Sequence, residues 1–491
     1  MKPMQRDFCF LVSWIWCFLL PLPAYRQQQT NSMEQLLHYV WRHKLFPLME
    51  LTTTDGLSVE VIDPGLHNRN AGPDFFNAKV RIDGVLWIGN VEVHDRSSDW
   101  YLHRHHTDDA YNNVVLHVVG EADSDVETAT GKTLPQLVLP VPEVVNSNYE
   151  SLLKSDDNPP CSHFIKELSP LMVHSWMSAL QTERLEQKTK AIEQRLKASK
   201  GSWDDAYFVT LARSYGFGVN SDTFERWAAT IPLHSVDHHR DNLFQIEAIF
   251  LGQAGLLELD TIPQQYHQAA VSEGYLGRLQ QEYRYLAHKF SFTPIDGKEW
   301  RFLRLRPQNF PYIRISQLAQ LYYDRHTSLA SLLDCSTVEQ AQELLSTHAT
   351  PYWQEHYVFG SKSQKSEKRL SAHSLQLILI NTVVPMLFAY GRYKGDSRFE
   401  DRAFEFLEDL KPEDNNIVRL WKRNGIDAVN AGDTQALIQL HTKYCNNKDC
   451  LRCRIGYEYL SSGFKRKRPQ ALVPPTVSML ADELGNENND K

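Results

Sequence analysis

The chain has 491 residues, 42% of them hydrophobic and 11% aromatic, which is enough for about two to four folded domains with a sizeable core. Its formal net charge of −8 excludes a molecule that attracts nucleic acid through an overall positive field. Any contact with nucleic acid therefore needs a local basic patch.

The first 32 residues differ from the rest of the chain. They contain an apolar run, FCFLVSWIWCFLLPLP, which is too short for a comfortable transmembrane helix and resembles the apolar part of a secretory signal. The signal-like residues 8–24 fit a small-x-small cleavage site poorly, because Leu22 stands two residues before Ala24. The alternative is a start at Met33, which opens an amphipathic helix. We favour Met33 and expect a cytoplasmic protein without a stable membrane span.

A β-hairpin is predicted after a helix at Glu34–Lys44 and a strand at Leu57–Ile62. Its two apolar segments, Phe75–Ile82 and Val85–Val93, are separated by Asp83-Gly84. This dipeptide is a strong signal for a two-residue turn between antiparallel strands. The two segments should therefore pair directly.

Ionisable side chains mark one end of this hairpin. Asp74 precedes its first strand, while Glu92 and His94 end its second strand. Side chains two apart on a strand share a face, so Glu92, His94 and Arg96 should point together, opposite Asp74. Two carboxylates suit Mg²⁺ or Mn²⁺, which prefer oxygen ligands. His94 would then orient or activate the attacking water.

The pattern Pro73-Asp74 followed by Glu92-Val93-His94 resembles the PD-(D/E)XK nuclease superfamily. A short helical segment near Asp108–Asn112 and a strand at Asn113–Val119 would complete the α-β-β-β-α-β order that the resemblance implies. It implies a restriction-endonuclease-like α/β domain over residues 33–158, with a mixed sheet and flanking helices. A mostly α-helical domain would follow.

The chain departs from that superfamily at His94, where a lysine is usual. Lys79 is a poor substitute, because it lies an odd number of residues from Asp74 and should face the other side of the strand. Arg96 would replace the lysine's charge but would not act as a base. A non-catalytic module on a degenerate nuclease fold, binding nucleic acid or protein, is therefore the competing class.

A second polar cluster lies just after the hairpin. Several neighbouring histidines can make a zinc site, and His-x-His places both rings on one face of a strand. His103 and His105 are candidates for contacts with substrate phosphate, and a zinc hydrolase that uses His103, His105 and His117 is a third hypothesis. The cluster comprises Asp99, His103, His105, His106, Asp108, Asp109 and His117.

Beyond a last strand at Leu134–Val141, the Asn158–Cys161 linker leads into a helical domain over residues 159–460. Its apolar helix Leu375–Tyr390, interrupted at Pro385, is expected to form the core. Residues 461–491 lack periodicity and are predicted to be disordered. Other helices are predicted at Leu171–Lys197, with Ser169 as cap and Pro170 in the first turn, and at Trp203–Tyr215, Asp222–Ala229, Asn242–Leu251 and Leu276–Phe290.

The segment Trp300–Ile315 is the best local basic patch. Its arginines alternate with aromatic residues, the mixture expected where guanidinium groups meet phosphates and rings stack on bases. The same mixture also occurs in ordinary packing between domains, so both interpretations stay open. The arginines proposed to bind substrate are Arg301, Arg304, Arg306 and Arg314.

Three cysteines with C-x4-C-x2-C spacing, Cys445, Cys450 and Cys453, indicate a structural metal. His441 would complete a Cys₃His zinc site. Cys161 would instead complete a four-cysteine site for zinc or a [4Fe–4S] cluster. Thiolate ligands of this kind favour a reducing compartment.

The motifs GPDF, GNVEVH, SSDWYLHRHH, LRLRPQNFP and YCNNKDCLRCRIG resemble an uncharacterised bacterial family, domain of unknown function 2851, over about residues 33–460. This resemblance implies no activity. Our leading hypothesis is a metal-dependent nuclease that hydrolyses phosphodiesters in DNA or, as second choice, RNA. Asp74 and Glu92 would hold the ion.

Overall fold

The computed structural model describes residues 24–46, 51–68, 70–324 and 327–465. The chain divides into a first unit, residues 1–164 with 447–491, and a second unit, residues 165–446. Residues 447–460, assigned by sequence to the helical domain, thus belong to the first unit.

The two ends of the chain were predicted to be atypical. The apolar core of the signal-like segment and residues 466–491 of the predicted disordered tail lie outside the described residues. Residues 461–465 of that tail are helical, because they belong to α20 (Arg454–Lys465).

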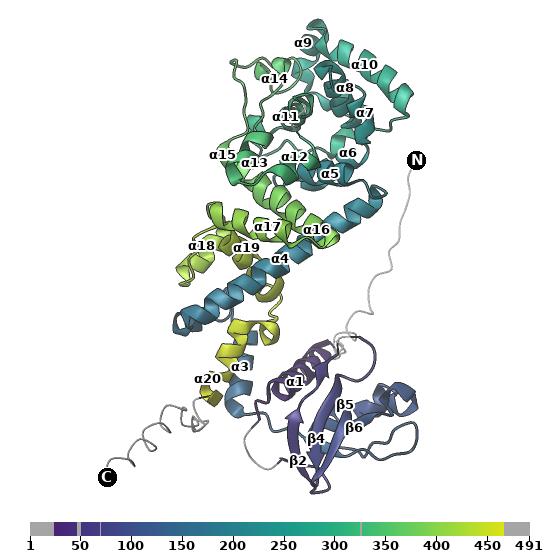
Figure 1. Cartoon of the computed structure of the whole chain (residues 1–491), viewed down its shortest axis with the longest axis vertical. Coiled ribbons are helices and arrows are strands. Elements are labelled where there is room, and N and C mark those ends of the chain that lie inside the picture. Colours follow the sequence, from purple (N-terminus) through teal and green to yellow (C-terminus); the bar gives the residue numbers. More distant parts are fainter. Residues whose placement is uncertain (1–23, 47–50, 69, 325–326, 466–491) are drawn as a thin grey trace, which may run out of the picture. The chain divides into compact units, whose positions relative to one another are not determined.

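The first unit is built on a mixed seven-stranded sheet with the order β1-β2-β4-β5-β6-β7, in which β3 also pairs with β4 (Figure 1). Neighbours from β1 to β5 are antiparallel, whereas β5, β6 and β7 run parallel. The predicted α/β unit followed by a mostly helical region is confirmed. The strands are β1 (Leu51–Thr52), β2 (Ser58–Asp63), β3 (Leu66–His67), β4 (Phe75–Ile82), β5 (Val85–Arg96), β6 (Val114–Glu121) and β7 (Gln136–Val138).

The predicted hairpin forms between β4 and β5. Asp83 and Gly84 have φ angles of 47° and 78°, the left-handed pair that a tight hairpin turn with the right twist requires. At the other end of β4 a bulge shifts the register between Phe75 and Ala78, where Asn77 has a φ of 55°. The bulge inverts the alternation of side chains along β4. After the bulge, Lys79 is exposed and lies on the strand face opposite the buried Ala78 and Val80. Its orientation relative to Asp74 stays a prediction.

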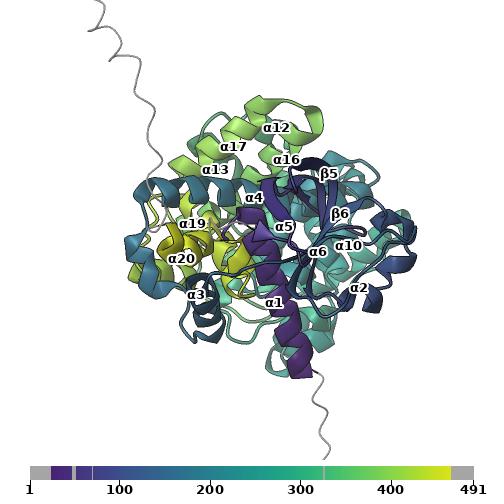
Figure 2. The same ribbon diagram turned by 90° about the horizontal axis from the view of Figure 1, so that it is seen from below.

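Helix α1 (Ala24–His43) covers one face of the sheet against β5 and β6 (Figures 1 and 2). Its buried apolar side chains Leu36, Leu37, Val40 and Trp41 recur at helical spacing and pack inward. Helix α3 (Glu143–Lys154) packs against α20 within the same unit. Between β5 and β6 the chain makes a short helix α2 (Asp99–Leu102) and two 3₁₀ turns, His105–Thr107 and Asp109–Tyr111.

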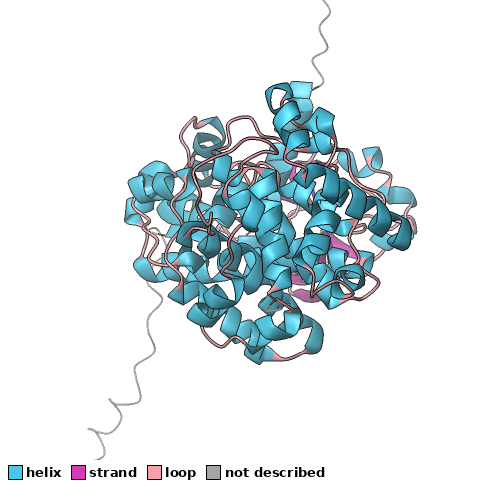
Figure 3. Ribbon diagram, turned by 90° about the horizontal axis from the view of Figure 1, so that it is seen from above, coloured by secondary structure: helices cyan, strands magenta, loops and turns pink. Residues whose placement is uncertain are grey.

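Helices dominate the second unit (Figure 3). The predicted helices form, and Ser169 is the N-cap residue of the first of them, although its side chain makes no capping hydrogen bond. The longer helices are α4 (Pro170–Ala198), α5 (Trp203–Tyr215), α6 (Ser221–Ala229), α8 (Leu243–Gln253), α10 (Tyr275–Phe290), α11 (Pro311–Tyr323), α13 (Val338–Leu345), α16 (Val384–Lys394), α17 (Ser397–Asp409), α18 (Asn416–Arg423) and α19 (Ala431–Gln439).

The apolar helix predicted around Pro385 continues through the proline. A π-helical turn at Leu379–Val383 joins α15 (Ala372–Ile378) to α16, and this wider turn accommodates the missing proline N–H. Among the described residues, this stretch, Ala372–Lys394, has the length and hydropathy of a membrane span. Most of its apolar window is buried inside the unit, as expected for a core helix.

Candidate active site

The bulged start of β4 and the central part of β5 bring Asp74 and Glu92 together. The backbone N–H of Asp74 donates to Glu92 Oε2 at 3.1 Å, and the N–H of Val93 donates to Asp74 Oδ2 at 3.0 Å. Each carboxylate is thus fixed by the backbone of the other strand. Glu92 is only 4% exposed, because β5 is a central strand covered on both faces.

The second oxygen of Glu92 faces imidazoles. Glu92 Oε1 lies 3.2 Å from His105 Nε2 and 3.6 Å from His94 Nε2. His94 Nε2 in turn lies 3.2 Å from His103 Nδ1. The nitrogens of the three histidines all lie within 4.8 Å of one another. We call Glu92, His94, His103 and His105 the imidazole–carboxylate cluster.

His117 on β6 supports this cluster from behind. Its Nε2 lies 2.8 Å from His94 Nδ1, and it is fully buried. A proton on His94 Nδ1 that is donated to His117 leaves the lone pair of His94 Nε2 directed at Glu92 and His103. The ring contact of His105 with Tyr111, at 3.8 Å between centroids, fixes the orientation of a second imidazole.

Burial sets the protonation of these groups. It lowers the pKa of His94 to about 2 and that of His117 to about 3, and the neighbouring imidazoles contribute in the same direction. Burial, followed by the charge of Asp74, raises the pKa of Glu92 well above its ordinary value. His94 and His117 are therefore neutral, which is the state in which imidazole binds a metal.

The cluster fits a divalent ion. Ligand atoms about 2.0–2.1 Å from a tetrahedral ion are separated from each other by about 3.3–3.4 Å. The separations of 3.2, 3.6 and 3.2 Å around Glu92 Oε1 and His94 Nε2 are close to this value. Three imidazoles and one carboxylate favour Zn²⁺, or Mn²⁺ as a harder alternative, over Mg²⁺. His103 is exposed, so the cluster is accessible from its side.

Helix α1 contributes two residues that the sequence prediction missed. His38 Nε2 lies 3.2 Å from Asp74 Oδ2. Burial lowers the pKa of His38, but the contact with Asp74 outweighs it and the net pKa is raised. Glu34, one helical turn earlier, also has its pKa raised by burial and interacts electrostatically with His38 and Asp74. The spacing of Glu34 and His38 on the polar side of an amphipathic helix was the available signal.

Arg96 does not join the cluster. Its guanidinium forms an exposed ion pair with Glu121 at 3.1 Å, because Arg96 lies at the end of β5 where the covering elements stop. The register of β5 with β6 is unbroken from Val91 to Arg96, so Arg96 lies on the strand face of Glu92 and His94 although its guanidinium pairs with Glu121.

Most of the remaining polar residues after the hairpin shape the loop. Asp99 accepts the backbone N–H of Arg96, Asp108 caps a 3₁₀ turn at Ala110, and Asp109 accepts from the side chain of Asn112. His106 contacts the ring of Tyr101. These contacts hold the segment that presents His103 and His105.

The arginine–aromatic segment of the second unit is not one surface. Arg314 is 5% exposed, and its guanidinium donates to Gln317 Oε1 at 2.9 Å and to Asn309 Oδ1 at 2.6 Å. It also lies over the ring of Phe217, and burial lowers its pKa to about 10. Its predicted role in phosphate binding is wrong, because α11 turns it into the core.

The aromatic partners of that segment also pack inward, with Trp300 and Tyr312 buried and Phe302 and Phe310 against the core. Their rings are therefore not displayed for stacking on bases. Arg301, Arg304 and Arg306 are exposed.

Three of the candidate cysteines meet in the first unit. Cys161, Cys450 and Cys453 are buried. Burial and the neighbouring thiols raise the pKa of Cys161 and of Cys450 to about 12. Such grouped thiols are suitable ligands for zinc or an iron–sulfur cluster. Cys445 and His441 belong to the π-helical turn Leu440–Cys445 at the end of the second unit.

The first unit is thus a mixed α/β module with a buried imidazole–carboxylate cluster that opens at one histidine. The chain belongs to the family described as a protein of unknown function, DUF2851, whose model matches residues 34–416. The match includes the whole cluster, and the motif YCNNKDCLRCRIG lies beyond it. No curated protein and no solved structure matches the chain.

Proposed function

We propose that the protein is a metal-dependent hydrolase of phosphodiesters in nucleic acid, with DNA as the first substrate to test and RNA as the second. The observation that carries the proposal is the convergence of Glu92 with three imidazoles beside Asp74, at one end of a hairpin. The order of helix, three main strands, short helix and parallel strand also agrees with the order implied by the nuclease resemblance.

His94, His103, His105 and Glu92 would hold the ion. When bound, a divalent ion supplies Lewis-acid polarisation of a phosphoryl oxygen. This assignment revises the predicted Mg²⁺ site, because Asp74 Oδ2 already accepts the Val93 N–H and lies against His38. It also differs from the predicted zinc triad, since His117 supports His94 rather than facing the exposed side of the cluster.

In this proposal, the Asp74–His38 pair accepts the proton of the attacking water. His94 is unsuited to activate water, because its Nδ1 lies against His117 and its pKa is lowered to about 2. The contact with Asp74 raises the pKa of His38, and His38 lines a cavity of the first unit. An imidazole oriented by a carboxylate is the usual arrangement for a general base. His38 would take the proton from the attacking water, and Asp74 would stabilise the resulting imidazolium.

The experiment measures metal content and cleavage in the same preparations of the full chain. Glu92→Gln should lose both the ion and the cleavage of a single-stranded or supercoiled DNA substrate. His38→Gln should keep the ion and lose about 10²–10⁴-fold in turnover. The matched control is Glu121→Gln, which changes an exposed carboxylate on the neighbouring strand β6 and should alter neither. Wild-type protein that is loaded with zinc or manganese and cleaves neither DNA nor RNA would refute the proposal.

A non-catalytic binding module is the second candidate, favoured by His94 in the position of the usual lysine. It predicts nucleic-acid or protein binding that survives Glu92→Gln and His38→Gln without any turnover by the wild type. The group of Cys161, Cys450 and Cys453 is proposed as a separate structural metal site of the first unit. Its metal must be counted apart from the ion of the cluster, through Cys450→Ser.

A further inference from the structure

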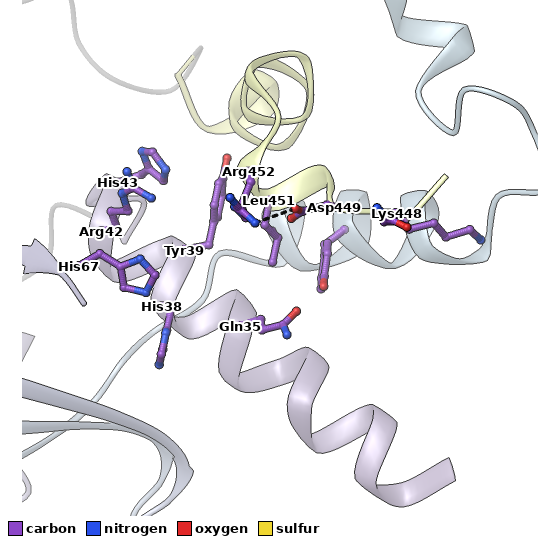
Figure 4. Close-up of a pocket in the computed structure, with 12 residues that line it drawn as sticks. Gln35, His38, Tyr39, Arg42, His43, His67, Lys448, Asp449, Leu451 and Arg452 are labelled. Atoms are coloured by element: carbon purple, nitrogen blue, oxygen red, sulfur yellow. Dashed lines mark hydrogen bonds and ion pairs between the residues drawn. The ribbon is translucent and has the colours of Figure 1, made fainter. Parts of the chain in front are cut away.

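The first unit contains a cavity of about 500 Å³ between α1 and the segment that begins at Asn447 (Figure 4). His38, Arg42 and His67 lie on one side of it, and Asp449 and Arg452 lie on the other (Figure 4). Neither wall was expected from the sequence, because they are separated by about 400 residues along the chain.

Positive charge dominates the lining. It includes the cations Arg42, Lys448 and Arg452 but a single carboxylate, Asp449. It also includes the imidazoles His38, His43 and His67. On a chain with a net charge of −8, this local excess of cations selects an anionic ligand.

The three cations of the lining make different contacts. Lys448 Nζ donates to the backbone carbonyls of Leu153 at 2.6 Å and Ser155 at 3.1 Å, which anchors the wall to the end of α3. Arg452 Nη1 lies 3.1 Å from Asp449 Oδ2. Arg42 is exposed, and among the described residues no hydrogen bond or ion pair engages it. Arg42 is therefore the cation best placed to meet a ligand.

The cavity is linked to the cluster through His38 and Asp74, since the backbone N–H of Asp74 donates to Glu92. His38 lines the cavity and also lies 3.2 Å from Asp74 Oδ2. Arg42 follows His38 by four residues on α1, which places it on the same face about 6 Å further along the helix. Tyr39 and Tyr149 also line this cavity, but both are buried, so they form part of its wall.

We propose that this cavity binds a phosphate of the nucleic-acid strand adjacent to the one that is hydrolysed, with Arg42 as the main contact and Arg452 as a second. This inference rests on the proposed function, because it takes the phosphodiester strand as the ligand. It places the strand-binding site in the first unit, in contrast to the arginine–aromatic segment predicted from the sequence.

The test uses fluorescence anisotropy to measure binding of a labelled single-stranded oligothymidine of about ten nucleotides. A chelator is present so that the oligonucleotide is not cleaved. Arg42→Gln should weaken binding about tenfold and reduce the slope of log affinity against log salt by about 0.7. The matched control Arg81→Gln removes an exposed arginine of β4 that pairs with Glu60, and it should leave affinity and slope unchanged.

Asp449→Asn gives a result that a loss of structure would not mimic. It removes the single carboxylate of the lining and releases Arg452, so affinity should rise about threefold or more. Equal affinity of the wild type, Arg42→Gln and Asp449→Asn would overturn the inference. Tight binding of an acidic peptide but not of the oligonucleotide would overturn it in favour of a protein partner.

Failure of this inference and failure of the proposed function are distinguishable. If the wild type cleaves DNA and Arg42→Gln binds and cleaves normally, the hydrolase stands and the cavity assignment falls. If the oligonucleotide binds in an Arg42-dependent manner but no preparation cleaves it, the cavity assignment stands and the hydrolase falls.

Discussion

The imidazole–carboxylate cluster and the arginine–aromatic segment present the same pattern in sequence, with ionisable residues placed among apolar ones. In the cluster, the buried groups lie next to one another and leave His103 exposed. In the segment, the guanidinium of the buried Arg314 donates to the amide oxygens of Gln317 and Asn309 and lies over the ring of Phe217. Buried polarity therefore indicates a functional site only where the groups remain available to a ligand.

The largest effect is expected at the centre of the cluster. Glu92→Gln and His103→Ala should each reduce cleavage about 10²-fold or more, because each removes a proposed ligand of the ion. Neither should change the thermal unfolding of the metal-free chain by more than a few degrees. Full cleavage by both variants would make the cluster an ordinary polar core, like the segment around Arg314.

Arg314 is expected to contribute to the free energy of unfolding and not to the binding of nucleic acid. Arg314→Met removes the donors to Gln317 and Asn309 and should cost about 2–4 kcal/mol of the free energy of unfolding. Arg306→Met, an exposed neighbour, should change it by less than about 0.5 kcal/mol. Denaturant unfolding of the full chain measures both. Equal stability of the two variants would place Arg314 at the surface after all.

Variants of His117 test whether this residue supports His94 or binds the metal itself. Its loss in His117→Ala should weaken metal affinity about 10–100-fold, because His94 would lose the acceptor that fixes its tautomer. His117→Gln retains an acceptor oxygen and should restore part of that affinity. Competition with a chelator gives both values. Equally weak metal binding by the two variants would contradict the supporting role of His117.

The smallest effect is expected at Arg96. Arg96→Gln breaks an exposed ion pair with Glu121 and should alter stability by no more than about 1 kcal/mol. Metal content and cleavage should be unchanged. If Arg96 replaced the charge of the missing lysine, the same variant would instead lose most of its turnover.

Local chemistry explains which parts of the site could be predicted. The dipeptide Asp83-Gly84 favours the tight turn between β4 and β5. The two-residue period of β5 places Glu92 and His94 on one face. Each signal depends on residues that are close together in the sequence, so each feature can be predicted without a structure. They predicted the hairpin and its polar end.

The missing parts depend on long-range packing. The bulge at Asn77 changes which residues of β4 share a face, and no local signal indicates it. His38 reaches Asp74 because α1 packs on β5 and β6, and Asn447–Arg452 forms a cavity wall because it returns to the first unit. The predicted role of Arg314 fails for the same reason. In sequence, an exposed basic patch and the start of a packed helix show the same mixture of arginines and aromatic residues.

X-ray absorption spectroscopy of the metal-loaded Cys450→Ser variant tests the central claim most directly, because it removes the contribution of the cysteine site. We expect an ion with about three imidazole nitrogens and one carboxylate oxygen at about 2.0–2.2 Å, and loss of an imidazole signal in His103→Ala. An ion surrounded by oxygen alone, or an imidazole signal unchanged in His103→Ala, would contradict it.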